Sequence, residues 1–127
     1  MDTTQLKRIP LFSNASDEEL KKVAVFATAR EEDEGTEVIR EGSFSRELLA
    51  IEDGTAEVTR DGEKIADLGP GDIFGEAGML DDDMRSASVT ATSRLKLISM
   101  GHFEVKRLKK AAPGVYEEIE KLVEERS

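Results

Sequence analysis

Apolar residues first recur at helical spacing between residues 16 and 28. The residues that share this spacing are Leu20, Val23, Ala24 and Ala27. They fall three or four positions apart, which places their side chains on one face of an α-helix. Ser16 precedes them and Glu19 follows three positions later, the capping-box pattern in which both side chains accept backbone N–H groups at a helix start. The pattern predicts a helix over about residues 16–28.

Between about residues 29 and 100 apolar positions alternate with polar ones, as where Thr90 separates Val89 from Ala91. Glycines divide this region into pieces of strand length, at Gly35, Gly42, Gly54, Gly62, Gly69 and Gly71. Asp61-Gly62 is typical of a two-residue hairpin turn, because both of its central positions need a positive φ. Short strands with closely spaced glycines predict an antiparallel sandwich or roll.

After Met100 the apolar spacing becomes helical again. Phe103 and Leu108 precede Pro113, and a second apolar stripe follows the proline. That stripe consists of Val115, Ile119, Leu122 and Val123. The pattern predicts C-terminal helices over about residues 101–126, and with the preceding elements it predicts a single, mainly β domain over residues 1–127.

The amino-acid composition argues against several classes of functional site. The 127 residues contain no cysteine and one histidine, His102, which argues against a disulfide framework, a metal site or a histidine-based enzyme. No apolar run approaches the roughly 20 residues of a membrane span, and the first residues lack the order of a signal peptide. We therefore expect a cytoplasmic chain with no membrane partner.

The net charge of −10 opposes binding to nucleic acid by this chain alone, because phosphate binding needs a concentrated basic surface. Four basic residues near the end of the first C-terminal helix suit the negative end of its dipole, and we interpret them as a solvated face. They are Lys106, Arg107, Lys109 and Lys110. An anionic ligand can still bind this chain where the pocket itself is locally positive.

One segment carries candidate chemistry. In the stretch 69–80 the turn Gly69-Pro70-Gly71-Asp72 is followed by Ile73-Phe74-Gly75-Glu76-Ala77-Gly78, and Arg85-Ser86-Ala87 comes after a short loop. Glycines at 75 and 78 allow backbone N–H groups to approach an anion without hindrance from a Cβ. Arg85 follows Glu76 closely enough for a loop to return its guanidinium to the same cradle. We expect an anion-binding site here, and we assign the Gly69–Asp72 turn no ligand role.

This segment resembles the phosphate-binding cassette of the cyclic-nucleotide-binding domain family, which includes the bacterial catabolite activator protein and the regulatory subunit of protein kinase A. The shared residues are Gly71-Asp72, Phe74-Gly75-Glu76 and Arg85-Ser86-Ala87. Gly35, Glu41-Gly42 and Gly54 stand where the roll of that family turns. The resemblance extends over roughly residues 9–125.

The resemblance implies an eight-stranded antiparallel jelly roll (a double-stranded β-helix) with an N-terminal helix, a short cassette helix and C-terminal helices. It places the roll at about residues 29–100 and the cassette at 74–87. The implied ligand is cyclic AMP or cyclic GMP, with Glu76 on the ribose and Arg85 on the phosphate. The implied binding residues are Phe74, Gly75, Glu76, Ala77, Gly78, Arg85, Ser86 and Ala87. No cofactor or metal is implied, and the chain is predicted to be a regulatory module that transmits binding through its C-terminal helix.

Other interpretations stay open at this point. Glu76 and Arg85 are also compatible with a structural ion pair. The same roll can serve as a protein–protein interaction module without nucleotide, an alternative favoured by Ala77 and by the carboxylates of 81–83. Enzyme activity is not expected. A protein partner or a homodimer formed through the C-terminal helix is a further possibility, as is the sensor half of a transcription regulator.

Overall fold

The computed structural model describes residues 3–40, 47–74 and 87–126. Its helical elements are α1 (Thr3–Lys7), the 3-10 helix η1 (Pro10–Phe12), α2 (Asp17–Phe26), α4 (His102–Ala111) and α5 (Pro113–Arg126). Its strands are β1 (Thr28–Glu32), β2 (Glu37–Ile39), β3 (Glu47–Asp53), β4 (Ala56–Arg60), β5 (Glu63–Leu68), β6 (Ile73–Phe74), β7 (Ser88–Ala91) and β8 (Leu95–Gly101). The chain therefore begins and ends in helices, with the strands between them.

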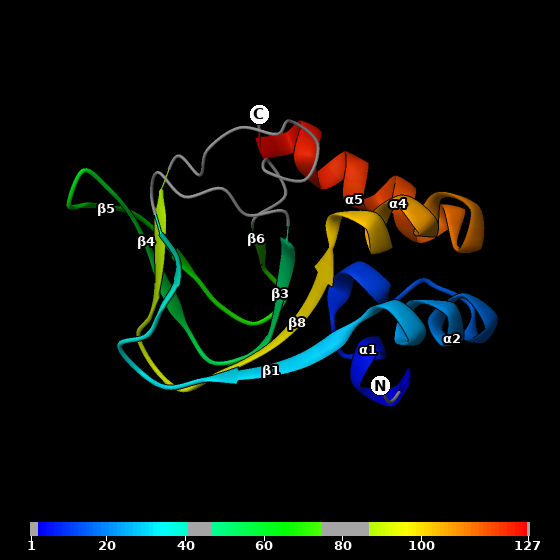
Figure 1. Cartoon of the computed structure of the whole chain (residues 1–127), viewed down its shortest axis with the longest axis horizontal. Coiled ribbons are helices and arrows are strands. Elements are labelled where there is room, and N and C mark those ends of the chain that lie inside the picture. The colour runs from blue at the N-terminus through cyan, green and yellow to red at the C-terminus, as the bar shows by residue number, and fades with distance from the viewer. Residues whose placement is uncertain (1–2, 41–46, 75–86, 127) are drawn as a thin grey trace.

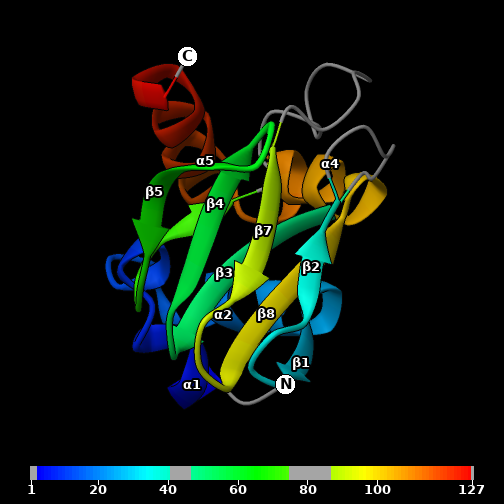
Figure 2. The same cartoon turned by 90° about the vertical axis from the view of Figure 1, so that its left-hand side faces the viewer.

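The strands form two four-stranded sheets, in the orders β1-β8-β3-β6 and β2-β7-β4-β5. Neighbouring strands are antiparallel in both sheets. The sheets face one another, and the helices gather on the outer side of the β1-β8-β3-β6 sheet (Figures 1 and 2). This arrangement confirms the prediction of a mainly β, eight-stranded antiparallel roll with helices before and after it.

The β1-β8-β3-β6 sheet is buried on both faces, because successive side chains of a strand point to opposite sides. On β3, Leu49 and Ile51 point between the sheets, whereas Leu48 and Ala50 point toward the helices. Two cores result. The inner core contains Ile39, Leu49, Ile51, Ala56, Phe74, Val89, Ala91, Leu95 and Leu97. The helix-side core contains Leu6, Ile9, Leu11, Phe12, Leu20, Val23, Leu48, Ala50, Ile73, Ile98, Met100, Val105, Leu108, Ala112, Val115 and Ile119.

The helix predicted over 16–28 is present as α2, with Ser16 as its N-cap. The Ser16 hydroxyl accepts the Glu19 N–H at 3.1 Å, and the Glu19 carboxylate accepts the Ser16 N–H at 3.2 Å, which confirms the capping box. The helix ends at Phe26, earlier than predicted, because Thr28 pairs with Ser99 as the first residue of β1. Sequence reasoning missed α1 and η1, which are too short to show a helical period.

The C-terminal prediction of two helices is confirmed, with α5 beginning at Pro113. A proline suits the first turn of a helix because its missing N–H would lack a partner there. Val115 and Ile119 of the predicted stripe are buried in the helix-side core. The side chains of Leu122 and Val123 lie outside the described part of the structure. No helix in the described ranges has the length and apolar character needed to cross a bilayer.

The hairpin predicted at Asp61-Gly62 joins β4 and β5. The two residues have φ values of +52° and +82°, as a type I′ turn requires, and Arg60 pairs with Glu63 beside them. At Gly54 the positive φ of +96° coincides with a close approach of two chain segments. A Cβ at this position would clash with the Arg94 carbonyl oxygen and lie 3.0 Å from the Leu95 side chain. Gly54 therefore lets the end of β3 pass the start of β8.

Replacing Gly54 by alanine is expected to lower the free energy of unfolding by roughly 2 to 5 kcal/mol, because the left-handed backbone strain adds to a clash with main chain. Gly62→Ala is the matched control. It has a similar positive φ of +82° but no atom within 4 Å of the added Cβ, so only the strain, about 1 to 2 kcal/mol, applies. Urea denaturation of both variants measures the difference, and equal losses would contradict the close approach at Gly54.

Candidate functional site

The site predicted at residues 74–87 begins at the end of β6. This strand pairs with β3, with Phe74 opposite Leu49 and Ile73 opposite Ala50. Phe74 is 5% exposed and packs in the inner core, whereas Ile73 packs in the helix-side core. The site therefore starts from a strand that both cores hold in place.

The turn before β6 is anchored to two other parts of the chain. The Asp72 carboxylate accepts the Gly69 N–H at 2.8 Å, and the Gly71 N–H donates to the Ile51 carbonyl at 2.9 Å. Gly71 has a φ of +91°, and a Cβ there would lie 3.0 Å from the Pro10 ring. These contacts give the Gly69–Asp72 turn a structural role.

The site ends where β7 begins. Ala87 is half-buried, and Ser88 after it pairs with Thr59 of β4. Val89 lies between Val58 of β4 and Ile39 of β2, inside the inner core. β6 and β7, the two strands that flank the predicted site, belong to different sheets.

Of the eight predicted binding residues, the structure places Phe74 and Ala87. The other six lie outside the described residues, namely Gly75, Glu76, Ala77, Gly78, Arg85 and Ser86. The predicted short cassette helix, the acidic loop 81–83 and the Glu41-Gly42 turn also lie outside them. The roles assigned to these residues therefore remain predictions.

Sequence reasoning missed a charged group on the inner face of the β1-β8-β3-β6 sheet. The Arg30 guanidinium donates to the Glu47 carboxylate at 2.7 Å and to the Glu32 carboxylate at 2.8 Å. Arg30 pairs with Leu97 and Glu47 pairs with Gly101, so the Arg30–Glu47 contact crosses β8 at Ser99, which lies between them on the same face. Ser99 is accordingly buried, with 7% of its surface exposed. The sequence contained one signal for this group, the spacing of two between Arg30 and Glu32, which places both side chains on one face of a strand. It contained no signal that Glu47 of β3 would be their partner.

The charge of Arg30 is already compensated. Burial lowers the pKa of the Arg30 guanidinium, but the hydrogen bonds to Glu32 and Glu47 outweigh it and raise the pKa above its ordinary value. Arg30, Glu32 and Glu47 together present one cation and two carboxylates. This group therefore offers no spare positive charge to an anionic ligand.

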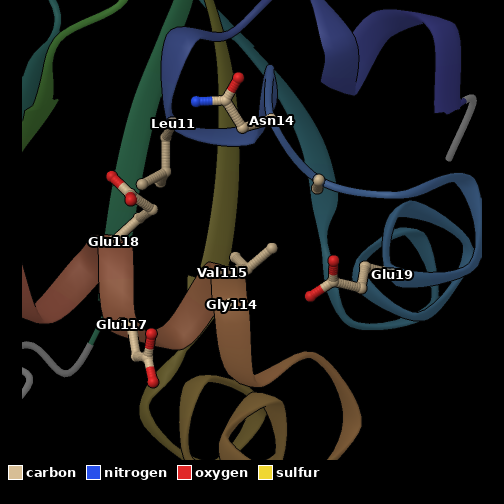
Figure 3. Close-up of a pocket in the computed structure, with 8 residues that line it drawn as sticks. Leu11, Asn14, Glu19, Gly114, Val115, Glu117 and Glu118 are labelled. Atoms are coloured by element: carbon tan, nitrogen blue, oxygen red, sulfur yellow. The ribbon is translucent and has the colours of Figure 1, made fainter.

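A pocket of about 200 Å³ lies on the other side of the β1-β8-β3-β6 sheet, between α2 and the first turns of α5 (Figure 3). It is lined by Leu11, Asn14, Ala15, Glu19, Gly114, Val115, Glu117 and Glu118. Its volume is below the roughly 300 to 1,000 Å³ of typical small-molecule sites, and its carboxylates oppose an anion. It is therefore a poor site for an anionic ligand, but it leaves space between the start of α5 and the N-terminal segment.

The matches to known proteins agree with this architecture. The family model described as the cyclic nucleotide-binding domain matches residues 30–111, more than half of the chain. The chain thus belongs to the cyclic nucleotide-binding domain family. The cAMP-dependent protein kinase regulatory subunit of Yarrowia lipolytica is 39% identical over 105 residues, which cover 81% of this chain and 28% of that protein. The chain spans about a quarter of the length of the curated relatives it matches.

Two solved structures are similar over most of the chain. The catabolite activator protein of Thermus thermophilus has a TM-score of 0.83 and 27% identity, covering 92% of this chain and 57% of that one. The regulatory domain of Toxoplasma gondii protein kinase A, crystallised with cAMP, has a TM-score of 0.70 and 28% identity, covering 83% and 42%. These similarities confirm the predicted family and jelly-roll fold.

Removing Arg30 should destabilise the domain, since two half-buried carboxylates would lose their shared cation. We expect Arg30→Leu to lower the free energy of unfolding by roughly 1 to 3 kcal/mol, measured by urea denaturation. The control is Arg94→Leu, whose guanidinium also bonds two carboxylates, those of Glu31 and Asp33, but is 62% exposed. Exposed pairs contribute about 1 kcal/mol or less. A loss for Arg94→Leu as large as that for Arg30→Leu would contradict the importance of burial here.

Proposed function

We propose that this chain is a regulatory module that binds a cyclic nucleotide at residues 74–87. The observation that carries the proposal is the family match over residues 30–111, which includes this segment. The packing of its flanks supports the proposal, because Phe74 at the start of the segment and Val89 after it are both buried in the inner core between the two sheets. Cyclic AMP is the first ligand to test, since relatives are named as cAMP-dependent or crystallised with cAMP.

In this proposal Arg85 neutralises the phosphate, together with backbone N–H groups around Gly75 and Gly78. Glu76 accepts a hydrogen bond from the ribose hydroxyl, and the inner strands form the apolar slot for the base. Arg30 cannot balance the negative charge of the ligand, because Glu32 and Glu47 already compensate its own charge. The proposal therefore depends on Arg85 as the cation. No cofactor or metal takes part.

Arg85→Ala should weaken cyclic nucleotide binding by roughly one to several powers of ten, because each lost charge-assisted hydrogen bond is worth about 1.5 to 3 kcal/mol. Isothermal titration with cyclic AMP and cyclic GMP measures the change. Arg94→Ala is the control. The predicted site adjoins Ser88 at the start of β7, whereas Arg94 follows the other end of this strand, at Ala91. Unchanged affinity in Arg85→Ala would refute the assignment of Arg85.

The same titration separates binding from the alternative of an interaction module without nucleotide. No heat from the unaltered chain at millimolar cyclic AMP or cyclic GMP would refute nucleotide binding and favour that alternative. A thermal-shift panel of cyclic mono- and dinucleotides then decides whether another member of the class is the ligand.

We further propose that binding is transmitted through α5. Val115 and Ile119 hold this helix on the helix-side core, while the pocket of about 200 Å³ beside its first turns leaves room for repacking. A ligand can shift such an equilibrium only through different affinities for its two states, and a full switch takes about 5.5 kcal/mol. A micromolar ligand supplies about 8 kcal/mol of binding free energy, so the requirement can be met.

If α5 transmits binding, binding of the cyclic nucleotide should change the distance between α5 and the roll. The chain has no cysteine, so Glu120→Cys on α5 and Asp53→Cys on β3 give unique positions for two spin labels. Saturating cyclic nucleotide should displace or broaden the distance distribution of this pair. A control pair within the roll, Asp53→Cys with Lys64→Cys, should stay unchanged. An unaltered α5 distance at saturating, independently measured binding would contradict the role of α5.

A further inference from the structure

Six exposed cations lie on two adjacent helices of this acidic chain. They are Lys21 and Lys22 on α2 and Lys106, Arg107, Lys109 and Lys110 on α4. We call them, with the two apolar residues described next, the α2–α4 surface. The chain as a whole has 18 basic and 28 acidic residues, so a third of its cations gather in this one region.

Strand register places the two helices side by side. Thr28 of β1 pairs with Ser99 of β8, so α2, which ends at Phe26, and α4, which begins at His102, meet at the same end of the sheet. The two helices are in contact and both extend away from the roll (Figure 1). The last turn of α2 therefore lies near the first turn of α4.

These two turns carry exposed apolar side chains. Val25 is 78% exposed and Phe103 is 69% exposed; the third large exposed apolar residue of the described ranges, Ile65, lies on β5 in the other sheet. Residues three and four apart are neighbours on a helix surface. Lys21 and Lys22 are thus the neighbours of Val25 on α2, and Lys106 and Arg107 are those of Phe103 on α4, so that each apolar side chain has two cations beside it on its own helix.

The cations of the α2–α4 surface are not used within the described structure. Lys7, Arg30 and Arg94 form ion pairs, but none of these six does so with any residue in the described ranges. The same helices also carry four acidic residues, none of which pairs with these cations: Asp17, Glu18, Glu19 and Glu104. Adjacent like charges destabilise a free domain. Solubility does not require them, because the net charge of −10 already supplies it.

We propose that the α2–α4 surface docks the chain on an anionic lipid bilayer, with Val25 and Phe103 entering the interface and the six cations meeting the head groups. Long basic side chains around a small apolar patch are typical of interfacial binding. The pocket beside α2 is lined mostly by residues of α5 and of the segment before α2, and it is not part of the α2–α4 surface. The α2–α4 surface thus presents exposed side chains, which suit a planar partner such as a bilayer. Carboxylates farther than a Debye length of about 10 Å from the bilayer are largely screened.

This docking is independent of the proposed nucleotide site and needs no membrane-spanning helix. The proposal differs from two expectations from the sequence, namely that the chain has no membrane partner and that the basic residues of α4 are only a solvated face. A single-stranded nucleic acid would favour several aromatic residues for base stacking, and the surface has one, Phe103. A bilayer is therefore the occupant that the surface fits best.

The test is co-sedimentation of the 127-residue chain with vesicles of phosphatidylcholine and phosphatidylserine in equal parts, and with vesicles of phosphatidylcholine alone. We expect binding to the anionic vesicles only, with release in molar salt. Lys106→Gln combined with Lys110→Gln should weaken binding about 30-fold, since each lysine near an anionic surface contributes a factor of about five. Lys64→Gln with Lys96→Gln removes the same charge from β5 and β8 and should change binding little.

Phe103→Ser should also weaken vesicle binding, whereas Ile65→Ser on β5 should not, and thermal melting verifies that every variant is folded. Sedimentation no greater than with phosphatidylcholine alone would overturn the proposal. Equal weakening by the Lys64/Lys96 control would overturn the location of the surface. Binding of polyglutamate or single-stranded RNA without vesicle binding would identify a different polyanion and refute the bilayer as partner.

Discussion

The central strand pair β3–β8 supports both halves of the molecule, because its side chains alternate between two cores. Leu49 and Leu97 point between the sheets, while Leu48 and Ile98 point toward the helices. Most positions of both kinds are apolar, so a slip of one residue would break the close packing on both sides and would also move Glu47 away from Arg30. The helices, the second sheet and β6, from which the candidate site begins, all attach to this pair.

The location of charge matters more in this protein than its total. The net charge of −10 predicts repulsion of anions, but the cations of this chain differ in how far carboxylates compensate them. On the inner face, Arg30 is fully engaged by Glu32 and Glu47, so it stabilises the sheet and is not available to a ligand. On α2 and α4, six cations stay exposed without a carboxylate partner in the described ranges. In the two proposals, an anionic ligand binds at residues 74–87 and an anionic bilayer binds the α2–α4 surface, so different parts of the same acidic molecule bind them.

Sequence patterns predicted the fold well where the signal is local. The capping box at Ser16 and Glu19, the Asp61-Gly62 turn and the helix after Pro113 each depend on residues close together in the chain, and the structure confirms them. The cassette pattern predicted the family, which the match over residues 30–111 confirms. The extension of α2 beyond Phe26 was wrong because pairing of Thr28 with β8 prevailed over helical spacing.

Turn chemistry, periodicity and the cassette motif were sufficient to establish a mainly β roll with terminal helices and to name Arg85 and Glu76 as the residues to test. They were not sufficient for contacts between distant residues. The Arg30–Glu47 ion pair joins positions 17 apart, and the close approach of Gly54 to Arg94 spans a larger separation. The α2–α4 surface likewise exists only because Thr28 pairs with Ser99. Each of these depends on strand register, which arises when the whole chain packs its two cores together and which no short stretch of sequence contains.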